Sequence, residues 1–281
     1  MSALTLPLVH VPGQCPPAVM LATLLRQRGA EVGETELLAW GRGLQFQYRP
    51  ESPDRWGGLS PWFLHDAVRE TGNWVDAYPF ATPDGLWATI ADRLAGRRPT
   101  LVASAGGELA LLLEARGGQV AWLSPWEPEP RQQPVSAFLA EMRPRSWFLF
   151  YLTPRLPDRR LLWQKALRRT AERLLCPPEG PLYTGLPALE RWAQGRPAAS
   201  PPPAHLGGPE HDLFRGQFAT GLTLAAEVLE EPRLTDLAGR YRECGEAWQR
   251  FCRSGGGLAE VVSLEWQAAR ELYALSRRWL F

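Results

Sequence analysis

Apolar residues recur at helical spacing in several stretches of the chain, the first of which covers residues 16 to 29. This segment, PPAVMLATLLRQRG, begins with proline at a tolerated first-turn position and stops at Gly29. It predicts a helix whose N-terminus lies directly after Cys15. Further helices are predicted in the front half at 35 to 40, 60 to 72, 84 to 96 and 135 to 142.

Short apolar runs separated by glycine pairs predict strands between these last two helices. TLVAS, ELALLLEA and QVAWLS follow one another, with glycines at 106–107 and 117–118 between them, which is typical of an antiparallel meander. The aromatic run SWFLFYL is short enough to be one more buried strand. We therefore expect the cysteine helix to pack against one antiparallel sheet, made by residues 99 to 104, 108 to 115, 119 to 124 and 146 to 152.

After Pro154 the strand signals end and helical patterns take over, at 160 to 175, 184 to 194, 211 to 230, 233 to 253 and 258 to 279. The helices on either side of Pro232 should be adjacent and antiparallel, because only a short turn joins them. The segment GRPAASPPPAHLGGP, 195 to 209, is typical of an exposed, mobile loop. The pattern predicts an α+β domain over 1 to 155 and an all-helical domain over 156 to 281.

Composition excludes several classes of partner. Thirty-one basic and thirty acidic residues give a net charge of +1, so no long-range field draws the chain to nucleic acid or to a membrane. The first twenty residues lack the features of a signal peptide, and no apolar run approaches the ~18 residues of a membrane span. We expect a cytoplasmic protein. The four cysteines fit neither a CxxC pair nor a zinc knuckle, so no disulfide framework, metal or cofactor is expected.

Cys15 is the residue whose placement indicates chemistry. The positive end of a helix dipole lowers the pKa of a cysteine beside it and so favours the nucleophilic thiolate. The alternative is that Cys15 is a small buried apolar residue, as many lone cysteines are. The tryptophans offer a second candidate, an aromatic ligand platform, but their spread over many elements favours packing in a core. They are Trp40, Trp62, Trp74, Trp87, Trp122, Trp126 and Trp147.

The surroundings of Cys15 resemble a known family. His10, Gly13 and Cys15, followed by the helix, Glu36 and the turn GRGLQFQY, are similar to the opening of the butirosin biosynthesis protein H N-terminal family. In the back half, GLPALERWA, FRGQFATGLTLAAEVL and YRECGEAW resemble the helical domain that usually follows it. The resemblance covers nearly the whole chain.

This resemblance implies a papain-like front domain in which Cys15 accepts an acyl group from a carrier-protein thioester and passes it to an amine. Such chemistry needs a base, normally a histidine oriented by an aspartate or asparagine. At the family's His and Asp positions this chain has Glu108 and Ser124. Both residues have a simpler interpretation, as a solvent-facing carboxylate and as a turn former before a proline. Among the histidines, His10 is the first candidate for the base, ahead of His65, His205 and His211.

Two functional hypotheses follow. The favoured one is a catalytically degenerate relative that acts as a binding or accessory module for a carrier protein, a peptide or a small metabolite. The alternative is an active cysteine acyltransferase or hydrolase that uses Cys15 with an unusual base. A carboxylate near Cys15 raises the thiol pKa, so we expect a sluggish thiol if Glu108 lies close.

Two further expectations concern the helical half. Its wide apolar faces also fit a helper protein that forms a homodimer. Arg215 occupies the family's Phe-Arg position, and we expect its guanidinium to hold a carboxylate or carbonyls at the domain junction.

Overall fold

The computed structural model describes residues 9–60, 62–79, 83–96, 98–104, 107–153, 155–176, 182–195 and 211–279. The chain folds into two compact units, one made of Met1–Leu37 and Thr71–Leu156 and the other of Leu38–Glu70 and Pro157–Phe281. We expected a continuous front domain over 1 to 155, but residues 38 to 70 belong to the helical unit. Nearly all of the expected loop at 195 to 209 lies outside the described residues.

A six-stranded antiparallel sheet forms the centre of the first unit, in the order β3-β8-β4-β5-β6-β7. All four predicted strands are present, so this part of the prediction is confirmed. The pattern missed the two edge strands. The strands are β3 (Trp74–Pro79), β4 (Thr100–Ser104), β5 (Leu109–Arg116), β6 (Gln119–Leu123), β7 (Arg131–Pro134) and β8 (Pro144–Tyr151).

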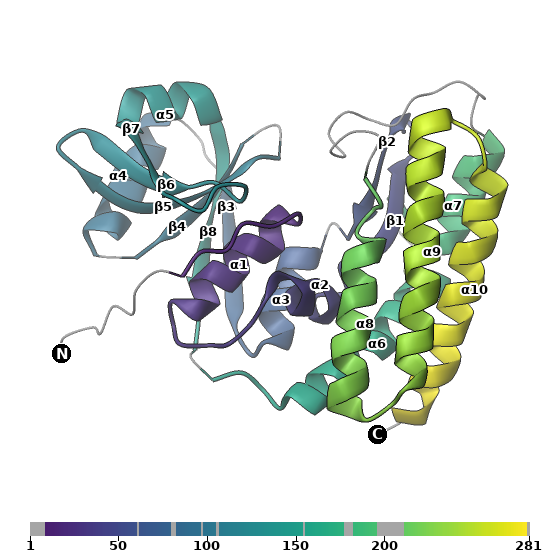
Figure 1. Ribbon diagram of the computed structural model, residues 1–281. Helices are drawn as coiled ribbons and strands as arrows, with labels where there is room; N and C mark the ends of the chain where they lie inside the picture. Colours follow the sequence, from purple (N-terminus) through teal and green to yellow (C-terminus); the bar gives the residue numbers. More distant parts are fainter. Residues whose placement is uncertain are drawn as a thin grey trace. The chain divides into compact units, whose positions relative to one another are not determined.

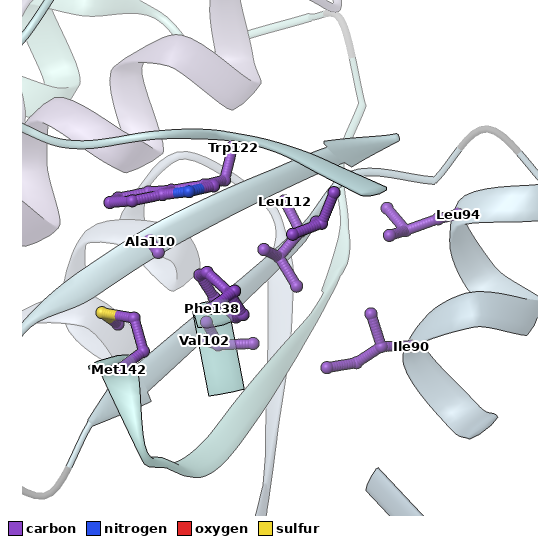
Figure 2. Packing of buried hydrophobic residues seen from close by; sticks show 9 residues of the cluster. Ile90, Leu94, Val102, Ala110, Leu112, Trp122, Phe138 and Met142 are labelled. Carbon is purple, nitrogen blue, oxygen red and sulfur yellow. The ribbon is translucent and has the colours of Figure 1, made fainter. Parts of the chain in front are cut away.

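Helices α4 (Pro83–Ala95) and α5 (Val135–Met142) supply side chains to an apolar cluster on one face of this sheet. Figure 2 shows Trp122 and Phe138 in this cluster, and their rings meet edge-on with centroids 5.6 Å apart. Leu101 and Leu111 are chain neighbours of cluster residues and so point to the opposite face of the sheet, where they are also fully buried. The central strands β4 and β5 are therefore covered on both faces.

Helix α1 (Pro16–Arg26) is the predicted cysteine helix, and it contacts β5. Proline at its start costs no hydrogen bond, since the first helical N–H groups have no intrahelical partner. At its end Gly29 adopts a φ of 89°, and the Ala30 amide returns to the Leu25 carbonyl at 3.1 Å. This left-handed turn satisfies carbonyls at the helix end and reverses the chain toward α2 (Glu34–Trp40).

The second unit is mainly helical, as expected for the back half. Helices α8, α9 and α10 run side by side in Figure 1, and α8 and α9 are joined by a turn at 230–232. A small sheet in the order β2-β1-β9 completes the unit. Its elements are β1 (Leu44–Arg49), β2 (Ser52–Leu59), α3 (Phe63–Glu70), α6 (Arg159–Leu175), β9 (Tyr183–Thr184), α7 (Gly185–Gly195), α8 (Arg215–Leu229), α9 (Arg233–Ser254), α10 (Leu258–Ser276) and a 3-10 turn (Arg277–Trp279). The predicted α+β fold, with its helical back half, is confirmed.

Aromatic rings fill the interior between this small sheet and the helices. Phe46 stacks on Trp248 with centroids 6.0 Å apart, and Trp56 lies 4.9 Å from Trp192. The expectation that the tryptophans share a core is wrong for three of them. Trp62, Trp74 and Trp126 each keep 59% of their surface exposed.

A buried ion pair lies in the middle of the helical unit. Arg215 and Glu265 are both 0% exposed, and the Arg215 Nε donates to Glu265 Oε1 at 2.6 Å. The same oxygen accepts the Trp248 indole N–H at 2.6 Å, and Arg215 also donates to the Leu213 carbonyl. The predicted carboxylate and carbonyl contacts of Arg215 are confirmed. The residues that Arg215 contacts all belong to the helical unit. These contacts therefore do not place Arg215 at a domain junction, as we had expected.

Within the described residues, no helix combines the length and apolar character that crossing a membrane requires.

Replacing Glu265 by alanine should lower the free energy of unfolding by about 3 to 5 kcal/mol, because Arg215 would remain charged and unpaired in the interior. The matched control is Glu260→Ala, which breaks the exposed Arg250–Glu260 pair and should cost less than about 1 kcal/mol. Urea denaturation followed by circular dichroism measures both values. Equal losses in the two variants would contradict the structural role of the buried pair.

Candidate functional site

Cys15 stands immediately before α1, where the sequence places it, but its side chain is 0% exposed. Burial away from water raises the pKa of its thiol far above the usual value, because the charged thiolate is the form that burial disfavours. The backbone amide of Ala18 works in the opposite direction and favours the thiolate. Burial is the larger effect, so the thiol stays protonated at neutral pH.

Glu34, the first residue of α2, reaches the start of α1. Its carboxylate oxygen Oε1 accepts the backbone N–H of Gln14 at 2.8 Å and also the backbone N–H of Cys15. The negative charge of Glu34 adds to the rise of the Cys15 pKa. A carboxylate at a helix N-terminus is stabilised there by free amides and by the helix dipole.

Gly13 makes this arrangement possible. A β-carbon at this position would come within 2.6 Å of the Glu34 carboxyl carbon and 2.8 Å of Val19, both far inside contact distance. The Gly13 amide in turn donates to the Pro125 carbonyl at 3.2 Å, at the turn that follows β6. The loop before Cys15 is thus held on one side by Glu34 and on the other by the end of a sheet strand.

His10 is bound to this same turn. Its Nε2 lies 3.0 Å from the Ser124 carbonyl oxygen, which can only accept, so this nitrogen carries the proton. Its Nδ1 lies 2.8 Å from the Thr23 hydroxyl of α1. Burial lowers the pKa of His10, which favours the neutral ring. Both ring nitrogens are engaged by groups other than the Cys15 sulfur, so this geometry gives His10 no role as its base.

Ser124 stabilises the turn that follows β6. Its carbonyl holds His10, and its hydroxyl accepts the Trp126 amide at 3.3 Å. This matches the turn-forming interpretation of a serine before Pro125. No hydrogen bond from its hydroxyl to a histidine occurs within the described residues, so an orienting role like that of the family's aspartate has no support here.

Glu108 is exposed and bonds locally. Its amide donates to the Ser104 hydroxyl at 3.1 Å, and its carboxylate lies 3.4 Å from the same group. We expected Glu108 to be the carboxylate that raises the Cys15 pKa. The direction of that shift is confirmed, but its causes are burial and then Glu34, whereas Glu108 makes the contacts of a solvent-facing strand residue.

Sequence reasoning missed Glu34 because its partners lie about twenty positions away and are backbone amides. One signal was present, in the glycine two residues before Cys15, since a glycine beside a helix start indicates a close approach. Glu36 lies on the same helix as Glu34 but binds a different amide. Its carboxylate accepts the Gly33 amide at 2.8 Å and so caps α2 in the manner of a capping box.

Comparison with solved structures gives distant matches. No family model and no curated protein matches the chain. The peptidase domain of Streptococcus ComA, a bifunctional ABC transporter of a quorum-sensing pathway, aligns with a TM-score of 0.38 and 11% identity, over 54% of this chain and 99% of that one. A double-glycine-motif protease from an AMS/PCAT transporter, solved with its leader peptide, aligns with a TM-score of 0.34 and 16% identity, over 50% and 87%. Likeness at this level does not transfer an activity.

The different positions of Glu34 and Glu108 predict different effects on the reactivity of Cys15. Glu34→Gln keeps an oxygen for the two amides but removes the charge, so the thiol pKa should fall and alkylation by iodoacetamide should quicken. The gain should stay below about tenfold, because burial is the main cause of the raised pKa and remains. Glu108→Gln should leave the rate unchanged.

Mass spectrometry of the alkylated peptides measures these rates, with the exposed Cys176 as the internal standard that reacts first. A faster Cys15 in Glu108→Gln would show that Glu108 acts on the thiol after all.

Proposed function

We propose that this chain is a catalytically degenerate relative of the butirosin biosynthesis protein H family. In this proposal it has a papain-like front domain and acts as a binding or accessory module in bacterial specialised metabolism. The family part of the proposal is supported by the sequence pattern around Cys15 and by the three motifs of the helical half. The helix and antiparallel sheet found around Cys15 agree with it.

One observation supports the proposed loss of catalysis: the backbone N–H of Cys15 donates to the carboxylate of Glu34. Acyl transfer through a cysteine passes through a tetrahedral intermediate, whose negative oxygen is stabilised by backbone N–H groups such as those at a helix start. Here the available amides hold a negative charge of the protein itself. A substrate carbonyl would have to displace Glu34 before it could use them.

Two other requirements of the reaction, a thiolate and a general base, also support the proposed loss of catalysis. A nucleophilic cysteine needs a thiolate, yet burial keeps the Cys15 thiol protonated. A general base needs a nitrogen directed at the sulfur, yet both nitrogens of His10 are engaged elsewhere. In this proposal the front domain keeps its fold in order to bind a carrier protein, a peptide or a small metabolite, and Cys15 is part of its packing.

An acyl thioester tests the proposal against its alternative, an active acyltransferase or hydrolase. The probe is acetyl-N-acetylcysteamine thioester, and the protein carries Cys176→Ser to remove the exposed thiol. We expect no acetyl adduct on Cys15 by intact mass and no hydrolysis above the rate without protein. An adduct that forms rapidly and is absent in the Cys15→Ser variant would mean that the chain is an active acyl-transfer enzyme.

The same probe tests the accessory role. If the front domain binds the thioester without turning it over, the melting temperature should rise with probe concentration, and by the same amount in Cys15→Ser, because the thiol takes no part. The non-reactive control is N-acetylcysteamine itself. A rise that depends on Cys15 would favour the active alternative.

A further inference from the structure

The edge of the six-stranded sheet at β3 presents aromatic side chains to solvent. Trp74 is 59% exposed, Tyr151 52% and Tyr78 39%. Strand residues two apart point to the same face, and the register pairs Trp74 with Tyr151, Asp76 with Leu149 and Tyr78 with Trp147. These three pairs therefore lie in a row on one face. We call them the β3–β8 trough.

Aromatic residues lie at both ends of the trough, and one acidic and one apolar residue lie between them. At one end Tyr78 stacks on Trp147 with centroids 4.4 Å apart. At the other end Trp74 and Tyr151 face each other across the strands, roughly 13 Å along β3 from the first pair. Asp76 and Leu149 lie between the two ends. Single exposed aromatic residues are common, but three exposed rings in one row beside the half-buried Trp147 form an apolar patch of the kind that marks an interaction site.

The charge of Asp76 indicates what this patch attracts. Its carboxylate accepts the Trp74 indole N–H at 2.7 Å and lies 3.4 Å from the Tyr78 hydroxyl. Both donors are neutral, and no basic side chain forms an ion pair with Asp76 within the described residues. A carboxylate beside exposed aromatic faces favours a cation, which both groups attract.

The protein already shows this contact at the far end of the trough. The guanidinium of Arg93, on α4, lies 5.1 Å above the ring of Trp147. Arg93 is held there by a hydrogen bond from its Nε to the Thr100 hydroxyl. Arg93 occupies the ring of Trp147, whereas the exposed ring of Trp74 and the Asp76 carboxylate beside it remain open to a second cation.

The backbone of β3 offers a second means of recognition. β3 is the last strand of the sheet, so its outer N–H and C=O groups have no strand partner in the described part of the chain. Natural sheets protect such edges with basic residues, prolines, bulges or short strands. The opposite edge, β7, is four residues long and has Arg131 at its start and Pro134 at its end. β3 pairs with β8 in unbroken register, and its only proline is its last residue.

We propose that the β3 edge binds an extended peptide segment, whose arginine side chain enters the trough between Trp74, Asp76 and Tyr151. The peptide adds to the sheet as a further strand, so backbone hydrogen bonds supply affinity and the arginine supplies selectivity. This site is independent of Cys15 chemistry. It stands whether or not the thiol is catalytic.

The test uses two fluorescein-labelled peptides and the full-length chain. One is Thr-Val-Thr-Arg-Thr-Val-Thr with blocked ends, and the other has citrulline in place of arginine, which keeps the shape and removes the charge. Fluorescence anisotropy should show the arginine peptide binding roughly fivefold to tenfold more tightly. Equal affinity of the two peptides, or no binding of either, would overturn the proposal.

Variants locate the binding. Trp74→Ala and Asp76→Asn should each weaken the arginine peptide and leave the citrulline peptide nearly unchanged. Trp126→Ala is the matched control, because Trp126 has the same 59% exposure in the same unit but lies outside the trough. If Trp126→Ala weakened binding as much as Trp74→Ala, the peptide would be binding elsewhere.

A third peptide tests the strand pairing. N-methylation of alternate residues removes backbone donors on one side and should abolish binding when those donors face β3. Blocked arginine amide alone should bind far more weakly than the peptide. If it competes at the same concentration, the site recognises a free cation and the strand-addition part is wrong.

Discussion

The bond between the Glu34 carboxylate and the amides at the start of α1 is the constraint on which the candidate site depends. It joins two helices that are separated by a tight turn, and it fixes the loop from His10 to Cys15 against the end of β6 through Gly13. Hydrogen bonds to a charged acceptor contribute about 1.5 to 3 kcal/mol each, which is enough to hold a short loop in one conformation. The same bond occupies the amide that a catalytic cysteine would use. Under the proposed function, the stability of the loop and the loss of catalytic geometry therefore have one cause.

Regular elements were predictable from the sequence because their signals are local. The meander of β4, β5 and β6 is marked by glycine pairs, and the end of α1 is marked by Gly29, whose φ of 89° suits a residue without a β-carbon. Edge strands were harder, since β3 and β7 carry neither a long apolar run nor regular alternation. The transfer of residues 38 to 70 to the helical unit depends on long-range packing, such as that of Phe46 on Trp248, which periodicity does not report.

The position of the candidate site was predictable from the sequence, but the contacts that set its chemistry were not. The position of Cys15 before a helix followed from Pro16 and the apolar spacing, and the rise of its pKa was expected in direction. The resemblance led us to assign the negative charge near Cys15 to Glu108, because it places residues by their position along a strand. The pKa of the thiol depends instead on burial first and then on the nearby charge of Glu34. Arg215 shows the opposite case. Its fixed contacts were foreseen from one motif, because a buried guanidinium must find a carboxylate or carbonyls wherever the fold places it.

The central claim is that Cys15 is a neutral, buried thiol. The most direct measurement is an NMR titration of the protein with ¹³C-labelled cysteine, in which the Cβ shift distinguishes thiol from thiolate. We expect the Cys15 signal to keep the thiol value through neutral pH and beyond about pH 8.5, where an unperturbed cysteine is half ionised. A Cys15 signal that is already at the thiolate value at pH 7 would show that the thiol is ionised and not neutral.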